Sequence, residues 1–281
     1  MTDNGATSGL SQSSIDDENR RFWDELCGTQ LAEHLGITDS GPESLKRFDD
    51  WFLDFYCYLD RHIPFAALKG KRVLEVGLGY GTVSQKLAEA GALYTGLDIA
   101  AGPVAMVNHR LHQIGLAGEA RQGSVLECPF DNESFDFVVA IGCYHHTGDL
   151  QRAIDETWRV LVPGGKAIIM LYNAYSYRRW EAEFGSSFRY WIWDKLGIGA
   201  APDTSERART QYDANRDGEG APSTLFTSVS RLRRMARRWS RVSWRRENMW
   251  TEGYLKYISR ETSLRWFSPW CGLDLYFTLQ K

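Results

Sequence analysis

The chain joins a short apolar run to three closely spaced glycines in the segment Val73-Leu74-Glu75-Val76-Gly77-Leu78-Gly79-Tyr80-Gly81-Thr82. The apolar run is typical of a buried strand, and the residues that follow Thr82 have a helical pattern. Glycines let the backbone turn tightly and come close to a ligand, while the first N–H groups of the next helix stay free to bind it. The segment therefore predicts a strand, a ligand-binding loop and a helix.

The same alternation continues on the C-terminal side of this segment. Short apolar runs predict strands at residues 72–76, 93–97, 120–123, 135–141 and 166–171. Helical patterns lie between them at 82–90, 103–114 and 150–161, and Pro163-Gly164-Gly165 predicts a turn after the last helix. This order predicts an open, mostly parallel sheet with helices on both faces, whose ligands bind at the carboxyl ends of the strands.

The segments outside this sheet differ from it in residue composition and in hydrophobic pattern. Residues 1–14 are polar and predict a disordered leader, and residues 15–68 predict an N-terminal helical cap with helices at 15–35 and 44–60. Gly28 is a point where the first of these helices could break. Residues 69–281 form the main domain, with an aromatic-rich helical insertion at about 173–227 that we expect to act as a lid. A helix at 229–239 and strands at 242–247 and 273–279 follow.

The composition is that of a globular protein. The 281 residues carry a formal charge of −3, and 43% of them are hydrophobic, which suffices for one large α/β domain. The five cysteines are odd in number and form no C-x-x-C pair, which argues against a disulfide framework. The chain has neither a signal-peptide pattern nor a long apolar span, so we expect no membrane contact and a cytoplasmic location.

The loop favours a ligand with a positive charge. In a dinucleotide fingerprint the third glycine stands one residue later than Gly81 does, which disfavours a nicotinamide cofactor. Glu75 would repel a pyrophosphate and suits a cationic amine. Asp98 ends the second strand, where a carboxylate can accept hydrogen bonds from both hydroxyls of a ribose.

Four segments, in this order and spacing, resemble the class I S-adenosylmethionine-dependent methyltransferases. They are VLEVGLGYG at 73–81, YTGLDIA at 94–100, PFDNESFDFVVAIGCYHHTGDL at 129–150 and RVLVPGGKAIIMLYN at 159–173. The resemblance covers residues 69–173. It implies a Rossmann-like α/β fold with seven strands, the last of them antiparallel, and an enzyme that uses S-adenosylmethionine as cofactor.

The resemblance also implies roles by position. Glu75 lies near the methionine amine, Asp98 binds the ribose and Ile99 packs on the adenine. Where many relatives hold the adenine amine with an acid, this chain has Ser124 and Val125. The remaining residues expected at the cofactor are Gly77, Leu78, Gly79, Gly81, Thr82 and Gly142.

The acceptor is expected beside the fourth strand. His145 and His146 follow that strand directly, and one of them is the candidate base for a hydroxyl acceptor, while the other faces a different way. No metal is expected, because neighbours in a loop rarely converge on one ion and no third ligand is evident. Aromatic residues predict a pocket for a small, partly flat acceptor, although each of them could simply belong to the core. The substrate-binding candidates are Trp51, Tyr56, Tyr144 and Tyr172.

These features favour methyl transfer to a small organic acceptor, at oxygen rather than nitrogen or sulfur. One alternative is an RNA or polyanion methyltransferase that uses the eight arginines of residues 231–246. An apolar stripe of Leu232, Met235, Ala236 and Trp239 through this run favours an amphipathic helix instead, so we do not expect a nucleic-acid partner. A second alternative is a non-catalytic partner protein that binds the cofactor. The sequence indicates neither the oligomeric state nor the acceptor.

Overall fold

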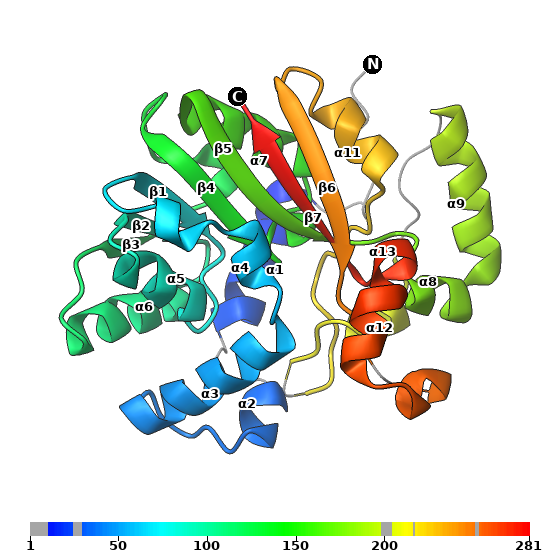
Figure 1. Ribbon diagram of the computed structural model, residues 1–281, viewed down its shortest axis with the longest axis horizontal. Coiled ribbons are helices and arrows are strands. Elements are labelled where there is room, and N and C mark those ends of the chain that lie inside the picture. Colours follow the sequence, from blue (N-terminus) through cyan, green and yellow to red (C-terminus); the bar gives the residue numbers. More distant parts are fainter. Residues whose placement is uncertain (1–10, 25–29, 198–203, 216, 251–252) are drawn as a thin grey trace.

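The computed structural model describes residues 11–24, 30–197, 204–215, 217–250 and 253–281. Its centre is a seven-stranded sheet in the order β3-β2-β1-β4-β5-β7-β6 (Figure 1). β7 runs antiparallel to both β5 and β6, and the pairs among β1 to β5 are parallel. The predicted sheet with its antiparallel last strand is confirmed. The strands are β1 (Arg72–Val76), β2 (Leu93–Asp98), β3 (Glu119–Gln122), β4 (Phe135–Ile141), β5 (Leu161–Tyr172), β6 (Arg241–Glu247) and β7 (Asp274–Gln280).

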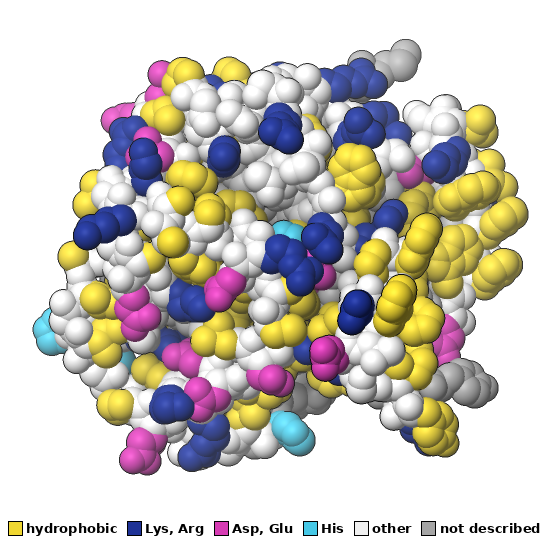
Figure 2. Space-filling model, viewed as in Figure 1, with side chains coloured by type: hydrophobic (Ala, Val, Ile, Leu, Met, Phe, Trp, Pro, Cys, Tyr) yellow, Lys and Arg dark blue, Asp and Glu magenta, His cyan; other side chains and the backbone are white. Residues whose placement is uncertain are grey.

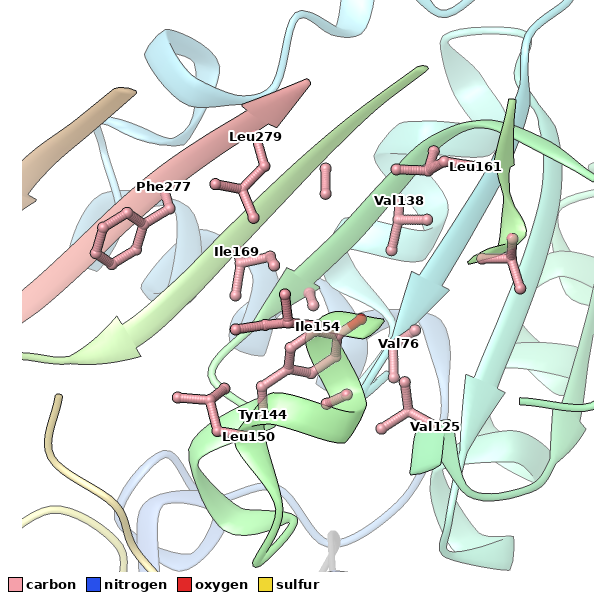
Figure 3. Packing of buried hydrophobic residues seen from close by; sticks show 14 of the residues in the cluster. Val76, Val125, Val138, Tyr144, Leu150, Ile154, Leu161, Ile169, Phe277 and Leu279 are labelled. Atoms are coloured by element: carbon pink, nitrogen blue, oxygen red, sulfur yellow. The ribbon is translucent and has the colours of Figure 1, made fainter. Parts of the chain in front are cut away.

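Helices cover both faces of the sheet. α5 (Thr82–Glu89) and α6 (Ala101–Gln113) pack on one face, and α7 (Leu150–Val160) and α11 (Val229–Met235) pack on the other. Because successive strand residues point to opposite faces, Val138 of β4 belongs to the α7 cluster and Val139 to the α5 and α6 cluster. Figure 3 shows the first cluster, in which Ile154 and Leu150 face the sheet residues Val138 and Ile169.

β5 is longer than the sequence indicates. The predicted turn Pro163-Gly164-Gly165 lies inside this strand, because β5 begins at Leu161. Phe135 pairs with Leu161, whereas Phe137 pairs with Lys166, so the intervening residues of β5 form a bulge. The chain turns there without leaving the sheet.

The N-terminal helices lie in the predicted regions. The structure describes α1 (Gln12–Asp24) and α2 (Gln30–His34) where a helix is predicted at 15–35, and Gly28 lies outside the described residues. α1 begins three residues early, because the Ser11 hydroxyl accepts a hydrogen bond from the Ser14 N–H at 3.2 Å. The helix predicted at 44–60 is α3 (Pro42–Phe55) followed by α4 (Leu59–His62). Figure 1 shows α2 and α3 beyond the end of the sheet toward which the parallel strands run.

The predicted insertion contains helices of its own: α8 (Tyr177–Ala182), α9 (Phe184–Leu196) and α10 (Glu206–Thr210). α9 exposes large apolar side chains, and Figure 2 shows hydrophobic residues gathered along this edge of the molecule. Part of the aromatic content of the insertion is therefore at the surface. The exposed residues of α9 are Phe184, Phe188, Trp191, Ile192, Trp193 and Leu196.

In the C-terminal part of the chain, the predicted apolar stripe is confirmed, but the helix that carries it is shorter than predicted. Leu232, Ala236 and Trp239 are buried against the sheet, although α11 ends at Met235 instead of residue 239. α12 (Arg260–Trp266) and α13 (Ser268–Cys271) precede β7. In the described part of the chain no helix is both long and apolar enough to cross a bilayer.

Candidate functional site

One cavity of about 620 Å³ opens at the carboxyl ends of β1, β2, β4 and β5. The sheet supplies one wall, through the glycine loop after β1 and the ends of the neighbouring strands. Helices α1 and α3 and residues 210–215 of the insertion supply the others. The cavity is therefore built from the sheet, the N-terminal helices and the insertion together, at the edge where an open α/β sheet binds its ligands.

The three glycines of the loop have different tasks. All three have positive φ angles, of 78° at Gly77, 51° at Gly79 and 81° at Gly81. A Cβ at Gly77 would come within 2.4 Å of the Cβ of Cys143, and one at Gly81 within 3.0 Å of Val107. A Cβ at Gly79 would meet no protein atom within 4 Å, and Gly79 lines the cavity. Gly79 thus leaves room for a ligand. Gly81 does not line the cavity and lets α5 pack closely on α6. The prediction of Gly81 as a cofactor residue is corrected.

Asp98 is held in place by the backbone. Its Oδ2 accepts a hydrogen bond from the Leu78 N–H at 2.8 Å, and its Oδ1 accepts one from the Ala100 N–H at 2.9 Å. Burial raises the pKa of this carboxyl to about 6, against the opposing effect of these backbone donors. The carboxylate therefore lies in the cavity wall in a fixed orientation, directly beside the glycine loop.

Glu75 is a second buried carboxylate in the same wall. Its Oε2 accepts hydrogen bonds from the Ser84 hydroxyl at 2.5 Å and the Tyr94 hydroxyl at 2.7 Å. Burial raises its pKa to about 7, because these two neutral donors compensate only in part for the lost hydration. A cationic group of a ligand would stabilise the ionised form of Glu75. Sequence analysis missed Ser84 and Tyr94, which orient this carboxylate.

The other residues expected at the cofactor all line the cavity: Leu78, Thr82, Ile99, Ser124, Val125 and Gly142. The hydroxyl oxygen of Ser124 accepts a hydrogen bond from the Leu126 N–H at 3.2 Å and so caps a short 3-10 helix. Thr82 donates its hydroxyl to Asp49 Oδ1 at 2.6 Å. The six residues line the same cavity, and their binding roles remain predictions.

Arg110 ties the loop to the N-terminal helices, and sequence analysis missed it. This buried side chain donates from Nη1 to the Tyr80 carbonyl at 2.7 Å and from Nε to Gln85 Oε1 at 2.8 Å. Its Nη2 forms an ion pair with Asp49 of α3. Since Asp49 also accepts the Thr82 hydroxyl, the glycine loop and α3 hold each other in position.

His146 lines the same cavity. Its Nδ1 lies 2.6 Å from the Ser223 carbonyl oxygen. A carbonyl can only accept, so Nδ1 carries a proton and donates it to this oxygen. Nε2 lies 3.5 Å from Asp213 Oδ2, and the Tyr172 hydroxyl donates to this carboxylate at 2.9 and 3.1 Å. We call His146 and Asp213 the polar corner of the cavity.

His145 lies behind the cavity wall. It is 1% exposed, does not line the cavity and stacks on Tyr172 with ring centroids 4.0 Å apart. Burial, with the adjacent His146, lowers its pKa well below the ordinary value. Only His146 of the two histidines lines the cavity, although the two rings lie side by side with their centroids 4.2 Å apart.

Three of the four predicted substrate residues line the cavity: Trp51, Tyr56 and Tyr172. Tyr144 does not, and its prediction is corrected. It lies in the short 3-10 helix Tyr144–His146, with its ring in the hydrophobic core (Figure 3) and its hydroxyl 2.6 Å from the Thr157 hydroxyl. Trp250 and Asp274, which the sequence did not single out, complete the acceptor side of the cavity.

Comparison with known proteins identifies this architecture. Residues 74–169, which run from β1 into β5, match the family of methyltransferase domains. The phthiotriol/phenolphthiotriol dimycocerosates methyltransferase of Mycobacterium leprae is 38% identical over 123 residues, which are 43% of this chain and 45% of that protein. A ubiquinone biosynthesis O-methyltransferase of Azorhizobium caulinodans is 31% identical over 106 residues, 38% of this chain and 42% of that protein. The chain thus spans less than half the length of these curated relatives.

The fold is also that of solved methyltransferases. A SAM-dependent methyltransferase of Thermotoga maritima superimposes with a TM-score of 0.53 and 16% identity, over 84% of this chain and 96% of that one. At 16% identity this likeness shows the fold alone. The assignment to a family comes from the sequence matches of residues 74–169 and of the curated relatives. The glycine loop, the two cavity carboxylates and the open space at Gly79 fit S-adenosylmethionine. Residues 74–169 therefore form a methyltransferase domain, and the chain has the fold and the cofactor loop of S-adenosylmethionine-dependent methyltransferases.

Proposed function

We propose that this protein transfers the methyl group of S-adenosylmethionine to a hydroxyl of a small organic acceptor. The observation that carries the proposal is the shared cavity, which Glu75, Gly79 and Asp98 line together with the polar corner. Relatives named as ubiquinone biosynthesis O-methyltransferases support oxygen as the accepting atom. The cofactor, when bound, supplies an electrophilic methyl group on a sulfonium.

The residues of this chain supply position and a base. Glu75 would bind the amine of the cofactor and Asp98 its ribose hydroxyls. Trp51, Tyr56 and Tyr172 would hold the acceptor and exclude water.

His146 is the proposed base. Because its Nδ1–H is held by the Ser223 carbonyl, Nε2 is free to take the hydroxyl proton of the acceptor. The Asp213 carboxylate, 3.5 Å away, stabilises the imidazolium that results.

The domain organisation fits this proposal. Residues 15–68 act as a cap and residues 173–227 as a lid over the main domain at 69–281; Trp51 of the cap and Asp213 of the insertion line the same cavity. The proposed location is the cytoplasm, which suits the free thiols of Cys57, Cys128, Cys143 and Cys271.

Several arginines of residues 231–246 are not available to bind a polyanion. Arg231 is buried, Arg234 pairs with Asp194 at 2.8 Å and Arg238 pairs with Asp155 at 2.9 Å. These partners favour a structural use of the run over RNA binding.

The test is an acceptor screen that measures S-adenosylhomocysteine release with phenols and hydroxylated metabolites. The proposal expects turnover with at least one of them, and much less with His146→Ala. Cofactor binding without turnover on any acceptor would favour the non-catalytic alternative. Binding of RNA that collapses steeply with added salt would favour the polyanion alternative.

A further inference from the structure

Three groups with metal-binding chemistry converge at the polar corner. The ligand atoms of His145, His146 and Asp213 all lie within 4.8 Å of one another. His145 and His146 are 1% and 3% exposed, and Asp213 is partly buried. Sequence analysis expected no metal because it found no third ligand, and the insertion supplies that ligand as Asp213.

The histidines of this cluster have unused hydrogen-bonding capacity. Neither ring nitrogen of His145 has a hydrogen-bond partner, and Nε2 of His146 has none either. Leaving a buried polar group unpaired costs about 1–3 kcal/mol, so such groups are rare in folded proteins unless something binds them. The 3.5 Å between His146 Nε2 and Asp213 is too long to satisfy this nitrogen.

The surroundings already orient these groups as in a metal site. A metal-binding histidine commonly donates its second N–H to a carbonyl, as His146 Nδ1 does to Ser223 at 2.6 Å. A metal-binding carboxylate is commonly hydrogen-bonded too, and Asp213 accepts the Tyr172 hydroxyl.

The geometry points to a divalent transition-metal site formed by His145, His146 and Asp213. Two imidazoles and one carboxylate suit Zn²⁺, Fe²⁺, Co²⁺ or Mn²⁺ better than Ca²⁺ or Mg²⁺, which prefer oxygen ligands. Ligands about 2.0–2.2 Å from an ion lie at most about 4.4 Å apart. A shift of a few tenths of an ångström therefore brings all three groups within range.

The site leaves coordination positions open toward the acceptor. His145 lies behind the cavity wall, while His146 and Asp213 line it, so an ion among them faces the cavity. The site itself does not depend on the proposed function, but its role does. With an ion bound, Nε2 of His146 is a ligand and no longer a base. The ion then lowers the pKa of the coordinated acceptor hydroxyl, whose proton passes to solvent.

Cobalt(II) titration of the untagged, chelator-treated protein tests the site without any assay of activity. Co²⁺ in a four- or five-coordinate nitrogen and oxygen site gives an intense visible absorption band. We expect this band with the wild type at one equivalent of Co²⁺. His145→Gln and Asp213→Asn should each weaken binding by at least the roughly 10–100-fold that loss of a supporting contact causes. His109→Ala, which removes an exposed imidazole of α6, is the matched control and should bind like the wild type.

Two outcomes would overturn the site: no such band in the wild type, or a band that both His145→Gln and Asp213→Asn retain. If either variant does not fold, anomalous diffraction from wild-type crystals soaked in Co²⁺ decides, since a lack of signal between His145, His146 and Asp213 overturns the site. Calorimetry with S-adenosylhomocysteine keeps the two proposals apart. Cofactor binding without Co²⁺ binding removes only the metal site, and Co²⁺ binding without cofactor binding removes the proposed function.

Discussion

Nε2 of His146 lies 3.5 Å from Oδ2 of Asp213, although the first residue follows β4 and the second lies in the insertion. The Ser223 carbonyl fixes the imidazole from its other side. Nε2 thereby faces a carboxylate in the wall of a cavity that also holds the glycine loop. This pairing makes the two histidines chemically unequal.

His146→Ala should therefore lower kcat on the order of 10²–10⁴-fold once an acceptor is known. His145→Ala should have a smaller effect, because His145 does not line the cavity. Both variants are assayed with a chelator present, which removes any contribution from a bound ion. Equal, small effects in the two variants would show that neither histidine is the base.

Asp98→Ala should weaken binding of S-adenosylhomocysteine by about 1–3 kcal/mol, since it leaves buried hydrogen-bonding groups unpaired. Isothermal titration calorimetry measures the change. Asp136→Ala is the control, because Asp136 accepts a backbone N–H from Arg72 at 2.8 Å but does not line the cavity. Wild-type affinity in Asp98→Ala would remove this residue from the ribose role.

Gly79→Ala should abolish cofactor binding in a protein that still folds. Gly70 offers a matched control: its φ of 70° is also positive and a Cβ there also meets no atom within 4 Å, but it does not line the cavity. Alanine should cost both sites a similar backbone strain, about 1–3 kcal/mol. Only Gly79→Ala should lose affinity, and equal cofactor affinities in the two variants would mean that the loop does not contact the ligand.

The contribution of Glu75 to the stability of the ligand-free protein should fall as the pH rises from about 5 to about 8. Burial raises the pKa of Glu75 from 4.5 to about 7, so the folded protein holds a proton here that the unfolded chain has released. The stabilisation is complete below the unfolded pKa and is lost as the pH rises through the folded one. Thermal unfolding of the wild type and Glu75→Gln across this range isolates the contribution, about 1–3 kcal/mol.

The cofactor should reverse this trend. A cationic amine binds the ionised Glu75 better than the neutral one, so affinity for S-adenosylhomocysteine should rise with pH over the same range. Glu75→Gln should show weaker binding with a flatter pH dependence. A wild-type affinity that is independent of pH would argue against a contact between Glu75 and the amine.

The sheet and the glycine loop could be predicted because local patterns encode them. The strand ends at Val76 and Ile141 follow from apolar runs that stop at glycine, and helix starts follow from the turns between them. The predicted turn at Pro163-Gly164-Gly165 shows the limit of this reasoning. Proline and glycine indicate a departure from regular structure, but a bulge inside a strand and a turn between elements have the same local signal.

The acceptor side depends on contacts between distant segments, which local patterns do not encode. Asp213 reaches the cavity because Ala221 and Arg209 hold its backbone, through the Ala221 N–H at 3.1 Å and the Arg209 carbonyl at 3.0 Å. The prediction of Tyr144 as a substrate residue was wrong for a related reason. In a 3-10 turn, neighbouring side chains point in different directions, so Tyr144 enters the core while His146 reaches the cavity.

Cys143 packs its thiol against the glycine loop, with Sγ donating to the Val76 carbonyl at 2.9 Å. Burial, with the charges of Asp98 and Glu75, raises the pKa of this thiol well above its usual value. Alkylating reagents attack thiolates, so we expect Cys143 to react slowly although it lines the cavity. Cys57 is exposed between α3 and α4. A maleimide dye should therefore label Cys57 and spare the cavity, which gives a fluorescent reporter on the cap of an enzyme whose cofactor loop is untouched.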